Sequence, residues 1–123
     1  NPYLTVLATS GELLRKEPAR VKAMVASVTE GWRAYLTDPK AANDRMHQLN
    51  PSMDMATFQE VAEAQKPFIE TDFTRQKGLG IMTSERWAAF YKDTQAQGIY
   101  PPGLDVTKAY TLQFVNKKVG LQP

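Results

Sequence analysis

The sequence predicts a mostly α-helical chain that belongs to an α/β protein, with one N-terminal strand followed by about six helices. One segment alone combines β-branched and apolar residues in the manner of a buried strand. The remainder joins helix caps to apolar positions at the 3.6-residue helical period. The 123 residues give room for one domain, and 42% hydrophobic with 23% charged residues is the mixture of a folded soluble protein.

The predicted strand runs from Tyr3 to Thr9, between a proline and a Ser-Gly turn. A buried strand needs neighbours, because each unpaired backbone N–H or C=O group costs roughly 1–3 kcal/mol. The segments Gly80-Ile81-Met82 and Ile99-Tyr100 are too short to pair along it. We therefore expect its partner strands to come from sequence before Asn1 or from a second copy of the chain, and the first source is favoured.

Two helices are predicted next. Thr9 and Glu12 have the spacing of a capping box, so a short helix should start there and run to about Glu17. Pro18 starts the second helix, because proline suits a first helical turn. The apolar residues of this helix form one stripe that predicts its buried face: Val21, Met24, Val25, Val28, Trp32, Tyr35 and Leu36.

Proline and aspartate delimit the third and fourth helices. Asp38-Pro39 should open the third helix, and Asn50-Pro51 should close it. Asp54 is the expected cap of the fourth helix, which Pro67 should end or bend.

The last third of the chain is predicted to hold two more helices. Residues 70–77 show no clear period. Thr83 should cap a helix that ends at Gly98. Asp105 should cap a final helix that runs to Lys117-Lys118, where positive charge suits a helix C-terminus.

The composition excludes several kinds of site. The chain has no cysteine, which removes disulfides, thiolate catalysis and most structural zinc sites. His47 is the one histidine, and no cysteine or paired carboxylate lies at metal-ligand spacing around it. We therefore expect no metal and no other cofactor. Fifteen basic residues are scattered among thirteen acidic ones, so no nucleic-acid partner is expected.

A series of short motifs runs through nearly the whole chain: Tyr3 to Thr9, Pro18, Val21, Val25, Gly31-Trp32, Tyr35-Leu36, Asp38-Pro39, Asn50-Pro51, Met53-Asp54, Gly78-Leu79-Gly80, Met82, Glu85-Arg86-Trp87 and Thr111 to Phe114. Their order resembles the C-terminal part of the thiamine-pyrimidine-precursor-binding proteins, whose wider relatives bind alkanesulfonates, taurine, nitrate or aromatic acids. In that family of periplasmic binding proteins (type II), two α/β lobes close on a ligand. The resemblance implies that residues 1–123 are a single unit, the C-terminal portion of such a protein.

The resemblance also implies a function and a site. The protein would be a periplasmic or extracytoplasmic solute-binding protein of an ABC importer, either free or lipid-anchored. It would hand a small nutrient, such as a thiamine precursor or a sulfonate, to a membrane permease without doing chemistry on it. Tyr3 and Thr5, where the strand leaves the hinge, would be ligand-binding residues, although some relatives have a carboxylate at the Thr5 position. Taken by themselves, Tyr3 is a sheet-edge aromatic residue and Thr5 an ordinary strand residue.

Other interpretations stay open. The chain could belong to a cytoplasmic pyrimidine-precursor synthase of the same fold, to a ligand-sensing domain of a signalling protein, or to a stand-alone helical interaction domain. Trp32 and Trp87 could stack on an aromatic ligand, but both lie on apolar stripes, so core packing is favoured. Gly78-x-Gly80 lacks the context of a nucleotide-binding loop and predicts a turn.

Overall fold

The computed structural model describes residue 3 and residues 5–118. Over this part the chain is mostly helical, as predicted. Six α-helices and one 3₁₀ turn follow one another: α1 (Gly11–Lys16), α2 (Pro18–Thr37), α3 (Lys40–Leu49), α4 (Met55–Ile69), α5 (Asp72–Lys77), α6 (Ser84–Ala96) and η1 (Val106–Lys108).

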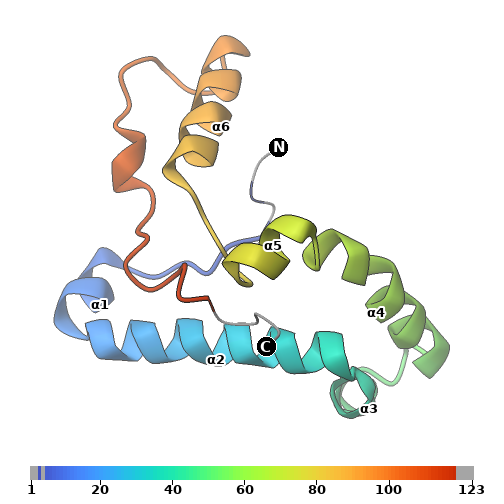
Figure 1. Cartoon of the computed structure of the whole chain (residues 1–123). Helices are drawn as coiled ribbons and strands as arrows, with labels where there is room; N and C mark the ends of the chain where they lie inside the picture. The colour runs from blue at the N-terminus through green and yellow to red at the C-terminus, as the bar shows by residue number, and fades with distance from the viewer. Residues whose placement is uncertain (1–2, 4, 119–123) are drawn as a thin grey trace.

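The helices form an open arrangement (Figure 1). The long helix α2 is the base of the molecule, α4 runs back above it, and α6 stands away from both. Helix α1 packs on α2, α3 on α4, and α6 on η1. The buried apolar side chains of the described residues are Val21 and Leu36 of α2 with Phe58 and Ala62 of α4. No helix in this range is long and apolar enough to span a membrane.

Side-chain caps fix several helix starts. The Ser10 hydroxyl accepts a backbone N–H of α1 at 3.1 Å, so the cap lies one residue after the predicted Thr9. Asp54 and Thr83 accept backbone N–H groups of α4 and α6 at 2.7 and 3.2 Å, which confirms both predictions. The hydrogen bond from the Thr57 N–H holds the pKa of Asp54 below its ordinary value.

Prolines mark two of the predicted helix boundaries, and a third proline lies inside a helix. Helix α2 begins at Pro18, and α3 ends just before Asn50-Pro51. Pro67 lies inside α4, which continues to Ile69. The helix therefore does not end at this proline, although Pro67 has no N–H to give to the carbonyl of Glu63 one turn earlier.

The predicted strand is not formed. Of Tyr3 to Thr9, Leu4 lies outside the described residues, and the others make no ladder with any described part of the chain. Val6 and Leu7 are 47% and 53% exposed. A strand needs a second strand to satisfy its N–H and C=O groups, and the helices of this chain offer none, so the backbone stays in contact with solvent.

Two further differences concern the C-terminal half. Residues 72–77, which show no clear period, form α5 because Thr71 and Thr74 build a capping box. The last helix is limited to the single turn η1 at Asp105, its predicted cap. Asn116 and Lys118 have positive φ angles of 60° and 58°, which an α-helix does not allow.

Long-range contacts account for the missing C-terminal helix. The Asn116 side chain accepts the Met82 N–H at 3.0 Å and donates to the Met82 carbonyl at 2.8 Å. These two bonds and the stacking of Tyr110 on Trp87 hold the segment against the start of α6 in an irregular conformation. Tertiary contacts here override local helix propensity.

Candidate functional site

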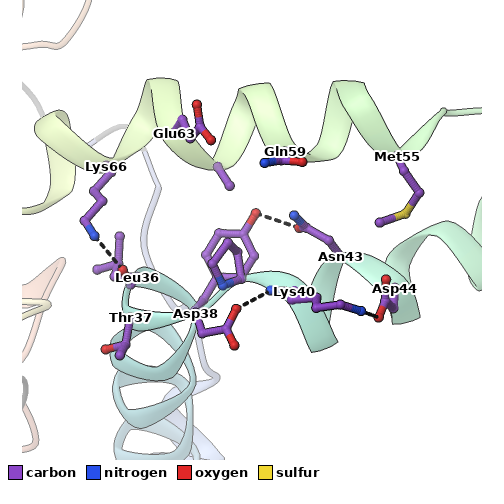
Figure 2. A pocket seen from close by; sticks show the side chains of 13 residues that line it. Leu36, Thr37, Asp38, Lys40, Asn43, Asp44, Met55, Gln59, Glu63 and Lys66 are labelled. Carbon is purple, nitrogen blue, oxygen red and sulfur yellow. Dashed lines mark hydrogen bonds and ion pairs between the residues drawn. The ribbon is translucent and has the colours of Figure 1, made fainter.

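A pocket of about 520 Å³ lies between the C-terminal end of α2, the start of α3, and α4 (Figure 2). Its volume is within the range of about 300–1,000 Å³ typical of small-molecule sites. The lining residues come from all three elements: Tyr35, Leu36, Thr37, Asp38, Pro39, Lys40, Asn43, Asp44, Met55, Gln59, Ala62, Glu63 and Lys66.

One face of α4 supplies a wall of this pocket. Met55, Gln59, Ala62, Glu63 and Lys66 all line it. They are spaced by four, three, one and three residues, which puts them on one side of a helix. The sequence of α4 therefore presents a stripe of apolar and polar side chains to the end of α2.

A part-buried hydrogen bond joins two residues that line the pocket. The Tyr35 hydroxyl donates to Asn43 Oδ1 at 3.0 Å, and Asn43 is only 3% exposed. The Trp32 ring packs edge-on against Tyr35, with the ring centres 5.7 Å apart. This contact joins α2 to α3 and places an aromatic ring beside an amide group.

Lys66 joins α4 to the end of α2. Its Nζ donates to the Leu36 carbonyl at 2.8 Å (Figure 2). The same Nζ lies 3.8 Å from a Glu70 carboxylate oxygen. Helix α2 has no basic residue in its own last turn. Lys66 thus supplies, from another helix, the positive charge that a helix C-terminus favours.

Two other charged residues of the pocket, Lys40 and Asp44, form an ion pair along α3. Asp38 Oδ1 accepts the Lys40 backbone N–H at 3.0 Å, and Lys40 Nζ donates to Asp44 at 2.7 Å. The hydrogen bond and charge of Asp44 raise the pKa of Lys40 above its ordinary value. Glu63 is exposed, and it has no ion pair with any described residue.

The two predicted ligand residues lie away from this pocket. The Tyr3 hydroxyl accepts the Thr83 N–H at 2.9 Å, and the Arg86 guanidinium carbon lies 4.1 Å from the centre of the Tyr3 ring. Thr5 is exposed. Neither residue lines the pocket. Their role in ligand binding stays a prediction.

Trp87 packs between two tyrosines, in agreement with its predicted packing role. Its ring stacks on the Tyr110 ring, with centres 5.2 Å apart and planes at 3° to each other. The centre of the Tyr3 ring lies 5.5 Å from that of Trp87, with the two planes at 45°. The Trp87 Nε1 atom is buried without a hydrogen bond to any described residue. Trp32, by contrast, is 40% exposed.

His47 is a partly exposed helix residue and Gly78-x-Gly80 forms a turn, as predicted. His47 is half-buried in α3, with Nδ1 2.8 Å from the Met53 carbonyl oxygen. The described residues contain no cluster of side chains able to hold a metal ion. Gly78 and Gly80 have positive φ angles of 103° and 70° and form the predicted turn after α5.

Comparisons with known proteins give one informative similarity. No protein-family model matches the chain, and no solved structure matches it. The chain is similar to the riboflavin-binding protein RibY of Chloroflexus aurantiacus, with 28% identity over 112 residues. The match covers 89% of this chain and 32% of that protein, so the chain spans about a third of the relative's length.

This similarity corrects the predicted family and function. The prediction of a thiamine-precursor or sulfonate-binding protein of an ABC importer, with a membrane permease as partner, is wrong. The relative is named for riboflavin, and no comparison leads to ABC substrate-binding proteins. The physical reason is that the matched motifs mark helix boundaries and apolar faces. Asp54 is a cap and Pro18 a first-turn residue, which many unrelated helical proteins require.

Proposed function

We propose that this chain is part of a flavin-binding protein and that the pocket between α2, α3 and α4 contacts the flavin. The similarity to the riboflavin-binding protein carries the ligand class. The pocket supports the proposal by its size and by the mixture of groups that line it.

The chemistry of the lining suits a flavin. The isoalloxazine ring is flat and largely apolar, with one edge of alternating hydrogen-bond donors and acceptors. Tyr35 and Met55 offer aromatic and apolar surface, and the exposed amide of Gln59 both donates and accepts hydrogen bonds. The hydroxylated side chain of a flavin needs acceptors, which carboxylates provide.

We also propose that the protein binds its flavin without doing chemistry on it. The chain has no cysteine, and its one histidine contacts a backbone carbonyl, so the usual nucleophile and base are not offered by these residues. That the helices belong to a larger α/β protein is likewise proposed, because the similar protein is about three times longer than the matched segment. The location outside the cytoplasm stays a prediction that cell fractionation would check.

Titration calorimetry with riboflavin tests the proposed site. Gln59→Ala should raise the dissociation constant by about two- to tenfold, because it removes one amide from the pocket wall. Gln65→Ala is the matched control: it makes the same change on α4 at a residue that does not line the pocket. Gln65→Ala should leave the affinity unchanged.

Two results would contradict the proposal. If a helical native protein, verified by circular dichroism, binds no riboflavin, the flavin-binding function is wrong. If riboflavin binds and the two glutamine variants behave alike, the flavin contacts another part of the protein.

A further inference from the structure

We infer that the flat ring system of the flavin stacks on the side chain of Tyr35, and that this contact quenches the fluorescence of the bound flavin. The inference rests on the proposed flavin-binding function. It follows from which side chains of the pocket still offer surface to a ligand and from how Tyr35 is held.

Tyr35 is the only aromatic residue among the described residues that line the pocket. A conjugated ring gains most from contact with another aromatic ring, because such pairs are more stable than the area they bury would explain. Leu36 and Ala62 are 5% and 6% exposed, so they present little surface to a ligand. Pro39 and Met55 are half-buried apolar residues, and neither has an aromatic face.

The hydroxyl group of Tyr35 is already used inside the protein. A phenol has one proton to donate, and Tyr35 donates it to Asn43 Oδ1 at 3.0 Å. Asn43 is buried, so the loss of this bond would take a donor from an enclosed oxygen, at a cost in free energy. Tyr35 therefore meets a ligand through its half-buried ring and not by donating its hydroxyl proton.

Contacts at both ends set the orientation of this ring. Its backbone belongs to the last turn of α2, and its hydroxyl is held by α3. Trp32 packs against it with the two planes at 88°. A side chain held in this way loses little rotamer freedom when a ligand packs on it, which favours binding. The Tyr35 ring is thus a platform that is fixed before the flavin arrives.

Helix α4 supplies the other side of the pocket. Met55 projects from the first turn of α4 toward α3, and Gln59 lies one turn further along (Figure 2). A thioether packs favourably on aromatic rings, and an amide can bond to the polar edge of a flavin. A flavin ring that lies on Tyr35 would therefore have an apolar and a polar partner on the facing helix.

Flavin fluorescence tests this contact. An excited flavin ring takes an electron from a phenol ring that it touches and returns the electron without emitting light. Riboflavin should therefore lose most of its fluorescence when it binds to the native protein. An indole quenches in the same way, so the Tyr35 variants are compared in a Trp32→Phe background, which keeps an aromatic ring beside Tyr35.

Two substitutions separate the ring of Tyr35 from its hydroxyl. Tyr35→Leu should restore the emission of bound riboflavin and raise the dissociation constant by about two- to tenfold. Tyr35→Phe should also restore the emission, because a phenyl ring is a poor electron donor, yet keep the dissociation constant within about twofold. Both variants remove the donor to Asn43, so their difference in affinity reports the aromatic ring.

A second ligand and a control residue complete the experiment. Lumiflavin has the same ring system without the hydroxylated side chain, so Tyr35→Leu should weaken its binding by the same factor. Tyr91→Phe is the matched control: it removes a hydroxyl that donates to the Pro101 carbonyl at 2.9 Å, on α6 and outside the pocket. Tyr91→Phe should change neither the emission nor the affinity.

The outcomes separate the inference from the proposed function. Riboflavin that binds to the native protein with its full emission would overturn the inference and leave flavin binding intact. Quenching and affinity that stay unchanged in Tyr35→Leu would also overturn it. A loss of affinity for riboflavin without one for lumiflavin would do the same, because Tyr35 would then contact the side chain. If the protein, shown to be folded by circular dichroism, binds neither flavin, the proposed function and the inference both fail.

Discussion

Tyr3 shows how a single residue can attach the N-terminal segment to a distant helix. Its hydroxyl accepts the N–H of Thr83, the cap of α6, across 80 positions of sequence. Its ring contacts Trp87 and lies under the Arg86 guanidinium. These contacts give Tyr3 a structural role at the start of α6.

Tyr3→Phe should lower the free energy of unfolding by about 1 kcal/mol, because the Thr83 N–H loses its acceptor while the ring contacts remain. Chemical denaturation measures the change. Tyr100→Phe is the control: Tyr100 is 45% exposed and its hydroxyl makes no hydrogen bond to a described residue, so its effect should stay within about 0.5 kcal/mol. Riboflavin affinity should be the same in both variants. A selective loss in Tyr3→Phe would instead support the sequence prediction that Tyr3 contacts ligand.

The pocket residues could be predicted from the sequence only in part. The spacing of Gln59, Glu63 and Lys66 with Met55 and Ala62 along α4 indicates a shared helix face. That this face meets the end of α2 depends on the Lys66 contact to the Leu36 carbonyl, thirty positions away. No local pattern encodes such a contact, so the sequence pointed to the strand residues Tyr3 and Thr5 instead.

At the scale of elements, local signals predicted most of the helices, although α5 was missed despite its local Thr71–Thr74 capping box. The predictions of the strand and of the final helix failed because they depended on distant parts of the chain. Caps such as Asp54 and Thr83 act within three residues of themselves, so their effect is visible in sequence. The final helix failed because Asn116 bonds to Met82, 34 positions away. The N-terminal strand failed because strand formation depends on a partner that the described helices do not supply.

Two glycines give a test of helix termination. Gly98 follows α6 with a φ of 71°, and the Ile99 N–H closes the helix on the Thr94 carbonyl at 2.9 Å. Gly31 lies inside α2, and an added Cβ would meet no atom within 4 Å at either glycine. The two sites therefore differ in backbone conformation and not in space.

Gly98→Ala should lower the free energy of unfolding by about 1 kcal/mol, because an L-residue is strained in the left-handed region. Gly31→Ala should raise it by about 0.5–1 kcal/mol, because alanine loses less entropy in a helix interior. Thermal unfolding of both variants gives the comparison. Changes of the same sign would show that α6 does not end in the conformation described.

At the scale of the whole molecule, the chain exposes far more surface than a compact domain. Its accessible surface is 9277 Å², whereas a compact protein of 13.8 kDa exposes roughly 6,600 Å². No described side chain is less than 2% exposed, and Met24 of the predicted apolar stripe on α2 is 58% exposed. The amphipathic pattern thus identified a helix face without identifying what covers it.

This surface predicts the response of the chain to urea. The unfolded chain would expose roughly 20,000 Å², so folding as described buries about four-fifths of the area that a compact domain of this mass buries. Because the m-value scales with the area exposed on unfolding, the chain in dilute solution should show an m-value about 20% below that of a compact 123-residue domain. An m-value as large as that of a compact domain, with a midpoint independent of protein concentration, would mean that the helices close on one another more tightly. A full m-value with a midpoint that rises with concentration would mean that copies of the chain cover the exposed faces.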